Sequence, residues 1–264
     1  MTSGLLLRPF RPIRRRHIAL LGQVARIQHG LRDQSTSLGF LWSFLHPLVL
    51  LVVLYAFFSR RVGQGIAYYP IFLLIGLVQF THFSKSTASA MRILNRMRSL
   101  ATNVIFPKDV LVYSSLLSDL PEFLISLSAT LLIALISGVP ASWALMALPV
   151  IVVLQMLLVL WMSLLLSVMY VFVRDLDHIF EVGMRLMFFV TPIIYSIDSL
   201  TPNLRRVALI NPMAHLVEYT RAIILEGRVP PVEQLLGFLI VSLVLVYASV
   251  MIFRRAEPAM VEQL

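Results

Sequence analysis

The residues with the most obvious potential for chemistry lie close together in one short polar segment. Asp175-Leu176-Asp177 has the D-x-D spacing of metal-dependent sugar transferases, and His178-x-x-Glu181 supplies two further candidate ligands. A catalytic metal site needs several converging ligands and an open coordination position, and a sugar transferase also needs a nucleotide-binding domain. Because the segment is too short for either, we interpret it as a charged loop that caps the following helix.

Other signatures of an enzyme or an ion-coupled carrier are weak. None of the 11 glycines opens a G-x-x-x-x-G-K-[ST] loop, so we do not expect ATP binding of the P-loop type. Buried ionisable residues mark ion-coupled transport. Only Lys85, Asp119 and Glu122 qualify, and each is expected within a few turns of a membrane surface. The chain has no cysteine, which excludes disulfides and thiolate metal sites. We therefore expect no catalytic residue, no metal site and no cofactor in this chain.

The elements that position these residues are apolar and long. Hydrophobic residues make up 59% of the 264 positions and charged residues 13%, against about 45–50% and 25% in a soluble domain. Charge-free runs cover 34–59, 62–84, 123–173 and 234–253, and Ser137-Gly138-Val139-Pro140 divides the third into two helices. A shorter run, 186–197, falls below the length needed to cross a core of about 30 Å. The pattern predicts an all-α membrane protein with five clear spans and a sixth, short one.

The distribution of positive charge predicts the orientation. If the N-terminus is cytoplasmic and six crossings occur, the inner segments carry 15 of the 22 arginines and lysines, and the outer segments carry six. Cytoplasmic loops are enriched in Arg and Lys, so we expect both termini in the cytoplasm. The net charge of +9 then reflects inner loops facing anionic lipid, and we expect no nucleic-acid partner.

Three polar segments carry helical periodicity. A cytoplasmic tail with a basic amphipathic helix, over 1–37, precedes one membrane domain over 38–264; a generic positive-inside anchor is the alternative interpretation. On an inner loop, a second amphipathic segment at about 92–103 places Ile93, Met97 and Leu100 on one face. In the outer region at about 198–228, two short apolar-periodic pieces, 204–210 and 216–225, predict a pair of re-entrant helices before the last span.

Five blocks of sequence resemble one family, in the family's order. They are L-G-F-L-W-S-x-L-x-P at 38–47, F-P-K-D-V-L at 106–111, R-D-L-x-H at 174–178, F-F-x-T-P-I-x-Y at 188–195, and N-P-x-x-x-L-x-E-x-x-R at 211–221. Together they are similar to the membrane subunits of ABC-type polysaccharide and polyol phosphate exporters, a branch of the ABC-2 type transporters that moves O-antigen, capsule and teichoic acid. The sequence departs from the pattern at His46, where an amide is common, and at Lys85, which matches no family position.

This resemblance implies a transport subunit rather than an enzyme. It implies a homodimeric permease in a bacterial inner membrane, served by two copies of a separate ATPase that holds ATP and Mg, with a lipid-linked polysaccharide as substrate. The segment at 92–103 would be the coupling helix that docks on the ATPase. Its candidate contact residues are Ile93, Arg96, Met97, Arg98 and Leu100.

The resemblance also suggests where the polymer passes, between the first and fifth spans. Aromatic side chains at helical spacing on these spans would contact the apolar faces of sugar rings, although aromatic stripes commonly reflect helix packing. The candidate lining residues are Phe44, Tyr55, Phe58, Phe188 and Tyr195. Arginines that bind the lipid phosphate through paired donors would form the inner rim, with Arg14, Arg15, Arg16, Arg26 and Arg32 as candidates.

Two other functions stay open at this point. An ABC-2 permease for drugs or small lipids would share the architecture and differ in the polysaccharide-type blocks. A polytopic lipid-linked sugar transferase would present an acidic or His-containing cluster on an aqueous face, which the sequence does not indicate.

Overall fold

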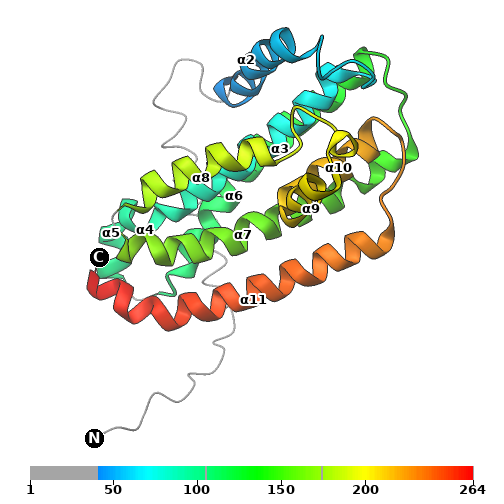
Figure 1. Ribbon diagram of the computed structural model, residues 1–264. Coiled ribbons are helices and arrows are strands. Elements are labelled where there is room, and N and C mark those ends of the chain that lie inside the picture. Colours follow the sequence, from blue (N-terminus) through cyan, green and yellow to red (C-terminus); the bar gives the residue numbers. More distant parts are fainter. Residues whose placement is uncertain (1–40, 105, 174, 264) are drawn as a thin grey trace, which may run out of the picture.

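In a computed structural model of the chain, residues 41–263 are described, except 105 and 174, and all regular structure among them is helical. Figure 1 shows a bundle of long helices with short helices gathered at its two ends. The expected amphipathic helix and the arginines at 14, 15, 16, 26 and 32 lie outside the described residues. The prediction of an all-α fold is confirmed for the described part of the chain.

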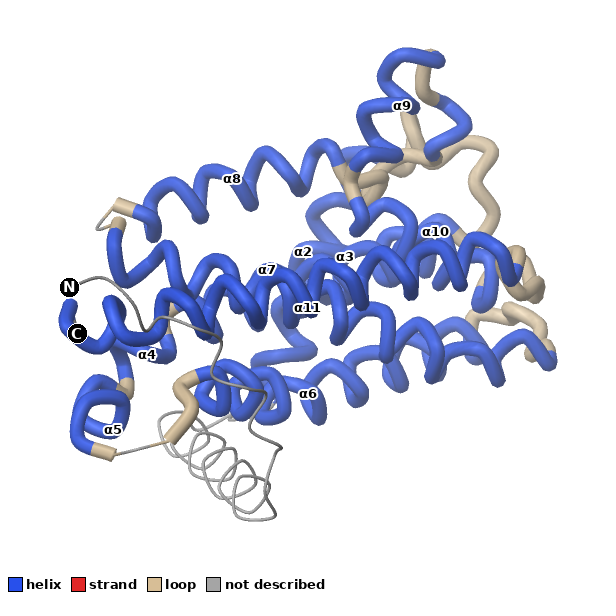
Figure 2. Tube along the Cα trace, turned by 90° about the horizontal axis from the view of Figure 1, so that it is seen from below, coloured by secondary structure: helices blue, strands red, loops and turns tan. Residues whose placement is uncertain are grey.

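Six helices form the body of the bundle. They are α2 (Leu41–Phe58), α3 (Tyr69–Met91), α6 (Asp109–Ile136), α7 (Leu148–Phe172), α8 (Leu176–Val190) and α11 (Val232–Gln263). Two short helices, α4 (Ile93–Arg96) and α5 (Arg98–Asn103), lie at the end where α11 finishes, which we call the α5 end. The opposite end, which we call the α10 end, carries η1 (Trp143–Ala147), η2 (Ile197–Ser199), α9 (Pro202–Ile210) and α10 (Pro212–Ile224). Figure 2 shows the same separation from a second direction.

Helix α3 is the centre of the bundle. It packs against α2, α6, α7 and α10, and its side chains Leu73, Leu74, Leu77 and Phe83 are almost completely buried. Helix α11 packs mainly along α7 and exposes most of its apolar surface, as a helix facing lipid does. Between apolar helices in lipid the hydrophobic effect is weak, so close packing and interhelical hydrogen bonds hold such a bundle together.

Among the described helices, three are long and apolar enough to cross a membrane: 109–136, 143–172 and 232–263. The stretch Leu45–Phe58 is apolar but shorter. Helix α3 has sufficient length, but Gln79, His82 and Lys85 interrupt its apolar sequence. These findings support a multi-pass membrane protein, and the six-span topology stays a prediction.

Four helices, α3, α6, α8 and α11, extend beyond the charge-free runs that predicted them. Helix α3 continues through Lys85 to Met91, and α6 begins at Asp109, well before residue 123. Glu122 falls in the fourth turn of α6 and forms an ion pair with Lys85 across the α3–α6 contact. Its distance from a membrane surface stays a prediction.

The shorter elements follow the predictions with two changes. The outer pieces form helices α9 and α10, and Asn211 separates them, as the sequence predicted. The single helix expected at about 92–103 is instead two, since the backbone leaves the helical conformation at Met97. The fifth apolar segment, 186–197, supplies only the last five residues of helix α8, which begins at Leu176 and ends at Val190, and its remainder is irregular backbone up to η2.

Candidate functional site

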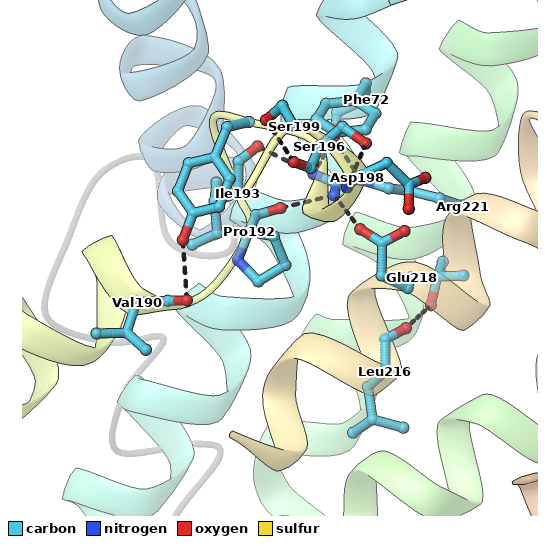
Figure 3. A network of polar contacts seen from close by, with 12 residues as sticks. Phe72, Val190, Pro192, Ile193, Ser196, Asp198, Ser199, Leu216, Glu218 and Arg221 are labelled. Atoms are coloured by element: carbon cyan, nitrogen blue, oxygen red, sulfur yellow. Dashed lines mark hydrogen bonds and ion pairs between the residues drawn. The ribbon is translucent and has the colours of Figure 1, made fainter. Parts of the chain in front are cut away.

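The α10 end is organised around one buried arginine on α10. The side chain of Arg221 is 2% exposed and donates hydrogen bonds to three backbone carbonyls, as Figure 3 shows. Its Nη1 lies 2.6 Å from the oxygen of Pro192, and its Nη2 lies 2.9 Å from that of Ile193 and 3.1 Å from that of Phe72. Glu218 accepts a further bond from Nη1 at 2.8 Å. The guanidinium also stacks on the Phe72 ring, 3.3 Å from its centroid. We call these contacts of Arg221 the clamp.

The clamp explains how irregular backbone is tolerated after α8. Where a helix ends inside a bundle, its last carbonyls have no intrahelical partner, and in lipid such groups must be paired internally. The planar guanidinium of Arg221 supplies several donors in a fixed geometry, and it reaches two carbonyls of the irregular segment at once. The hydroxyl of Tyr195 donates to two more, those of Phe189 and Val190, at 3.0 Å each.

Three further contacts fix this irregular segment, 191–195, in place, and we call the segment the break. Asn211 Nδ2 donates to Thr191 Oγ1 at 2.7 Å, and the Tyr69 hydroxyl donates to the carbonyl of Ile194 at 2.9 Å. Asn211 also caps α10, because its Oδ1 accepts from the amide of Met213 at 2.9 Å. Gly76 gives the break its close approach to α3, since a Cβ there would lie 3.1 Å from Ile193 and 3.2 Å from Arg221. The two sequence blocks at 188–195 and 211–221 therefore form one structural unit.

A series of polar contacts continues from this unit into the bundle. Gln79 Nε2 donates to Thr220 Oγ1 at 2.7 Å, and Gln155 Nε2 donates to the carbonyl of Gln79 at 3.2 Å. The next polar residue on α3, His82, stacks on Phe123 with ring centroids 4.1 Å apart. One turn further, Lys85 pairs with Glu122. The side chains of His82, Lys85 and Glu122 line a small cavity of about 20 Å³ that also borders Pro47 of α2, which is room for about one water molecule.

At the α5 end, one polar cluster ties the start of the α4–α5 segment to α8. Arg92 Nε donates to Asp177 Oδ1 at 2.6 Å, and the Tyr170 hydroxyl donates to Asp177 Oδ2 at 2.8 Å. Burial raises the pKa of Asp177, but the hydrogen bonds from Arg92 and Tyr170 outweigh it and hold the pKa below its usual value. Asp177 is therefore ionised at neutral pH, and we call this cluster the α8 latch.

A second cluster ties the start of α6, which follows the α4–α5 segment, to α11. The buried carboxylate of Asp109 accepts from Arg254 Nη2 at 3.3 Å and from the Tyr113 hydroxyl at 3.4 Å. Glu257 accepts from the amide of Lys108 at 3.1 Å. We call this cluster the α11 latch. In the chain the two latches flank α4 and α5: one binds Arg92, just before α4, to α8, and the other binds the start of α6, after α5, to α11.

The predicted coupling residues divide into an inner and an outer set. Ile93 is fully buried and packs among α6 and α7, while Met97 and Leu100 are half-buried against the core. The face these three share therefore points into the bundle. Arg96 and Arg98 are exposed on the opposite side. Ile93 is thus available as an anchor for α4 and not as a surface contact.

Within the described residues, no ring contact joins a predicted pathway residue of α2 to one of α8. Phe58 is half-buried against the core, and the exposed ring of Tyr55 lies 6.2 Å from that of Tyr69. Phe188 packs edge-on against Phe80 of α3 at 5.4 Å. Helix α2 packs on α3 and α6, whereas α8 packs on α3 and α7. The backbone of Phe44 belongs to α2, and its side chain lies outside the described part.

The segment with the D-x-D spacing has a structural role. Asp177 belongs to the α8 latch, and within the described residues no group of three or more His, Asp or Glu side chains could hold a metal ion. Asp175 occupies the position before α8 but makes no side-chain capping bond, so that detail of the capping prediction was wrong. An acidic first turn still complements the helix dipole.

The fold and these contacts define a helical membrane subunit built around paired polar groups. The profile of the ABC-2 type transporter family matches residues 26–225, and the chain belongs to this family. It is 33% identical to the O-antigen export system permease protein RfbA of Myxococcus xanthus, over 86% of this chain and 89% of that protein. It is 26% identical to a protein of the same description from Klebsiella pneumoniae, over 75% and 76% of the two chains. It is 23% identical to the polysialic acid transport protein KpsM of Escherichia coli, over 84% and 88%.

Several residues of the site had no predicted role. Arg221, Thr191 and Asn211 stood in the sequence blocks, but nothing in the sequence identified their partners. Gln79, His82 and Lys85 recur at three-residue steps on an otherwise apolar helix, and this spacing was the signal for a polar stripe on one helical face.

Proposed function

We propose that the chain is the permease of an ATP-driven exporter that moves a lipid-linked polysaccharide of the O-antigen, capsule or teichoic acid type. The observation that carries this proposal is the similarity over nearly the whole chain to proteins described as O-antigen export permeases. A polysialic acid transport protein matches over a comparable length, which extends the expected substrates to capsule-like polymers.

The proposed topology has six crossings with both termini in the cytoplasm of a bacterium and the re-entrant helices on the outer side. The α5 end would face the cytoplasm. The charges there support this, in line with the positive-inside rule. Arg92, Arg96 and Arg98 lie in or beside α4 and α5, and Arg254 and Arg255 lie in the last ten residues of α11.

The permease would act as a homodimer with two copies of a separate ATPase. Within one chain α3 lies between α2 and α8, so a path enclosed by the first and fifth spans needs a second copy to close it. Exposed apolar residues on α2 and α8, including Phe57 and Phe189, are available for that contact. Tyr55 and Phe188 would lie beside the polymer with Phe44, Phe58 and Tyr195, and the arginines at 14, 15, 16, 26 and 32 would meet the lipid phosphate.

Coupling would run through α4 and α5. Arg96 and Arg98 would contact the ATPase, while Ile93, Met97 and Leu100 would anchor the two helices to the bundle. A displacement of this segment would be transmitted through the α8 latch to α8 and through the α11 latch to α11. Hydrogen bonds to ionised groups are shorter and stronger than neutral ones. The contacts of the α8 latch, at 2.6 and 2.8 Å, suit a mechanical connection of this kind, and those of the α11 latch are longer.

The test is co-purification of the permease with its candidate ATPase, followed by ATP turnover and by surface detection of the polymer. Arg96→Glu/Arg98→Glu is expected to abolish both association and export. Arg60→Glu/Arg61→Glu is the matched control, since these exposed arginines lie at the opposite end of the bundle. Association that survives the first variant would refute the coupling role, and export of no glycan in a complemented strain would refute the proposed substrate.

A further inference from the structure

A groove of about 950 Å³ separates the α9–α10 pair from α11; it borders the clamp through Glu218 and shares no residue with the latches. Its floor includes Trp161 of α7, its walls include Tyr219 of α10 and Phe238 of α11, and its mouth carries Arg205 and Arg228. The volume lies at the upper end of the range of about 300–1,000 Å³ for small-molecule sites. From this groove we infer a binding site for a glycerophospholipid of the outer leaflet, an inference that takes its orientation from the proposed function.

The depth of the groove in the membrane indicates which chemical class of ligand can occupy it. Leu245, at the deep end, lies 13 residues after the start of α11, which is about 20 Å at 1.5 Å per residue. Trp161 lies equally far into α7. Both residues therefore sit well inside a hydrocarbon core of about 30 Å. Sugar hydroxyls at that depth would lose water without gaining partners, whereas an acyl chain fits walls of Leu158, Val241 and Leu245.

The mouth suits a phosphate headgroup. Arg205 contacts Asp198 at 3.2 Å, and Arg228 pairs with Glu226, which leaves further N–H donors on each guanidinium. Of the acidic groups that line the groove, Glu218 is already paired with Arg221 at 2.8 Å. Two partly exposed guanidinium groups can therefore bind a phosphate at the level where headgroups meet acyl chains.

A lipid in this groove would support the helices that hold the break. The opposite face of α10 carries Arg221 and Thr220, which bind the break and α3. On the groove face, Tyr219 and His215 reach α11 through Phe238, with ring centroids 6.4 Å apart in each pair. The lipid would fill the remaining space between α10 and α11 and so restrict movement of α10.

The groove can be filled without disturbing the packing. Gly237 lines it, and a Cβ added there has no atom within 4 Å outside its own helix. Gly237→Phe would therefore place a ring in the groove, and it removes a residue that weakens helices. Val244→Phe is the matched control, because Val244 is 60% exposed on the same helix and does not line the groove.

The experiment counts phospholipid on the full-length chain. After extraction in mild detergent, native mass spectrometry is expected to find about one glycerophospholipid per wild-type chain. Delipidated protein is then titrated with palmitoyl-oleoyl phosphatidylglycerol, and the lipid-dependent rise in melting temperature gives the affinity. Gly237→Phe and Arg205→Gln/Arg228→Gln are each expected to weaken binding about tenfold or more, and Val244→Phe is expected to match wild type.

Each outcome decides the inference. Equal lipid retention by wild type and Gly237→Phe, or none on wild type, overturns it; if Gly237→Phe does not fold, the arginine double variant decides. Retention of a polyprenyl phosphate in place of a glycerophospholipid would make the groove a substrate subsite and overturn the assignment. Phospholipid binding by the wild-type chain, together with no glycan export from a strain complemented with it, would refute the proposed function and leave this inference standing.

Discussion

From the contacts between the clamp and the break we predict how much stability the Arg221→Met variant loses. The substitution keeps an unbranched side chain of similar reach but removes the hydrogen bonds to three buried carbonyls and leaves Glu218 without its charge partner. A hydrogen bond to a charged group contributes about 1.5–3 kcal/mol, and removing one partner of a buried ion pair costs about 3–5 kcal/mol. These losses overlap because they share one side chain, and Met recovers some packing, so we expect a net loss of about 4 kcal/mol.

The assay is thermal unfolding of the purified chain in detergent. At about 2–4 °C per kcal/mol for a protein of this size, Arg221→Met should lower the melting temperature by about 8–16 °C. Arg221→Lys keeps the charge, but a single ammonium cannot reproduce the planar fork, so its loss should be at least half as large. Arg206→Met is the control, because Arg206 is exposed on α9.

The order of the melting temperatures of the three variants tests this prediction. Arg221→Met should be the least stable, followed by Arg221→Lys, with Arg206→Met close to wild type. If the melting temperature of Arg221→Met equals that of Arg206→Met, the break is held by packing alone. The guanidinium would then contribute nothing to holding the break, and the clamp would be refuted.

Two further predictions concern the other polar groups. Lys85→Met alone should destabilise the chain by about 1 kcal/mol, because it removes the partner of Glu122 in a partly exposed pair, and adding Glu122→Gln should restore most of that loss. A double variant no better than the single, in a melting-temperature cycle, would refute the pairing. For the α8 latch, the lowered pKa of Asp177 means that its contribution is present above the ordinary carboxyl pKa and is lost as pH falls through the lowered value. The stability difference between wild type and Asp177→Asn should therefore be constant from about pH 8 to 5 and shrink below about pH 4; a difference that already changes near pH 6 would contradict this.

The sequence predicted those features of the fold that depend on neighbouring residues. Charge-free runs and amphipathic periodicity identified the long helices, the α9–α10 pair and the turn before α7, where Gly138 adopts a positive φ of 86°. The limits of α3 and α6 could not be predicted in this way. Both helices continue past charged residues, and Lys85 finds its partner, Glu122, 37 positions away in the sequence.

The candidate site was less accessible to sequence reasoning for a related reason. The acceptors of Arg221 are backbone carbonyls of residues 72, 192 and 193, and a carbonyl has no residue type that a sequence can display. For α4, periodicity showed that Ile93, Met97 and Leu100 share a face but could not tell whether that face meets the bundle or a partner. The burial of Ile93 resolves this.

The arrangement of clamp and latch at opposite ends of α8 has a mechanical consequence. The helix has 15 residues, so it behaves as a rod of about 22 Å whose far end is pinned to α3 and α10 and whose near end is attached to Arg92. Such a rod swings about its pinned end: a shift of about 2 Å at Asp177, typical of switching helices, tilts it by about 5° and hardly moves Val190. The space beside α8 would then open first at the α5 end, where the ATPase is proposed to bind, and would stay narrow at the break. The packing at the α10 end therefore need not loosen when the α5 end admits a substrate.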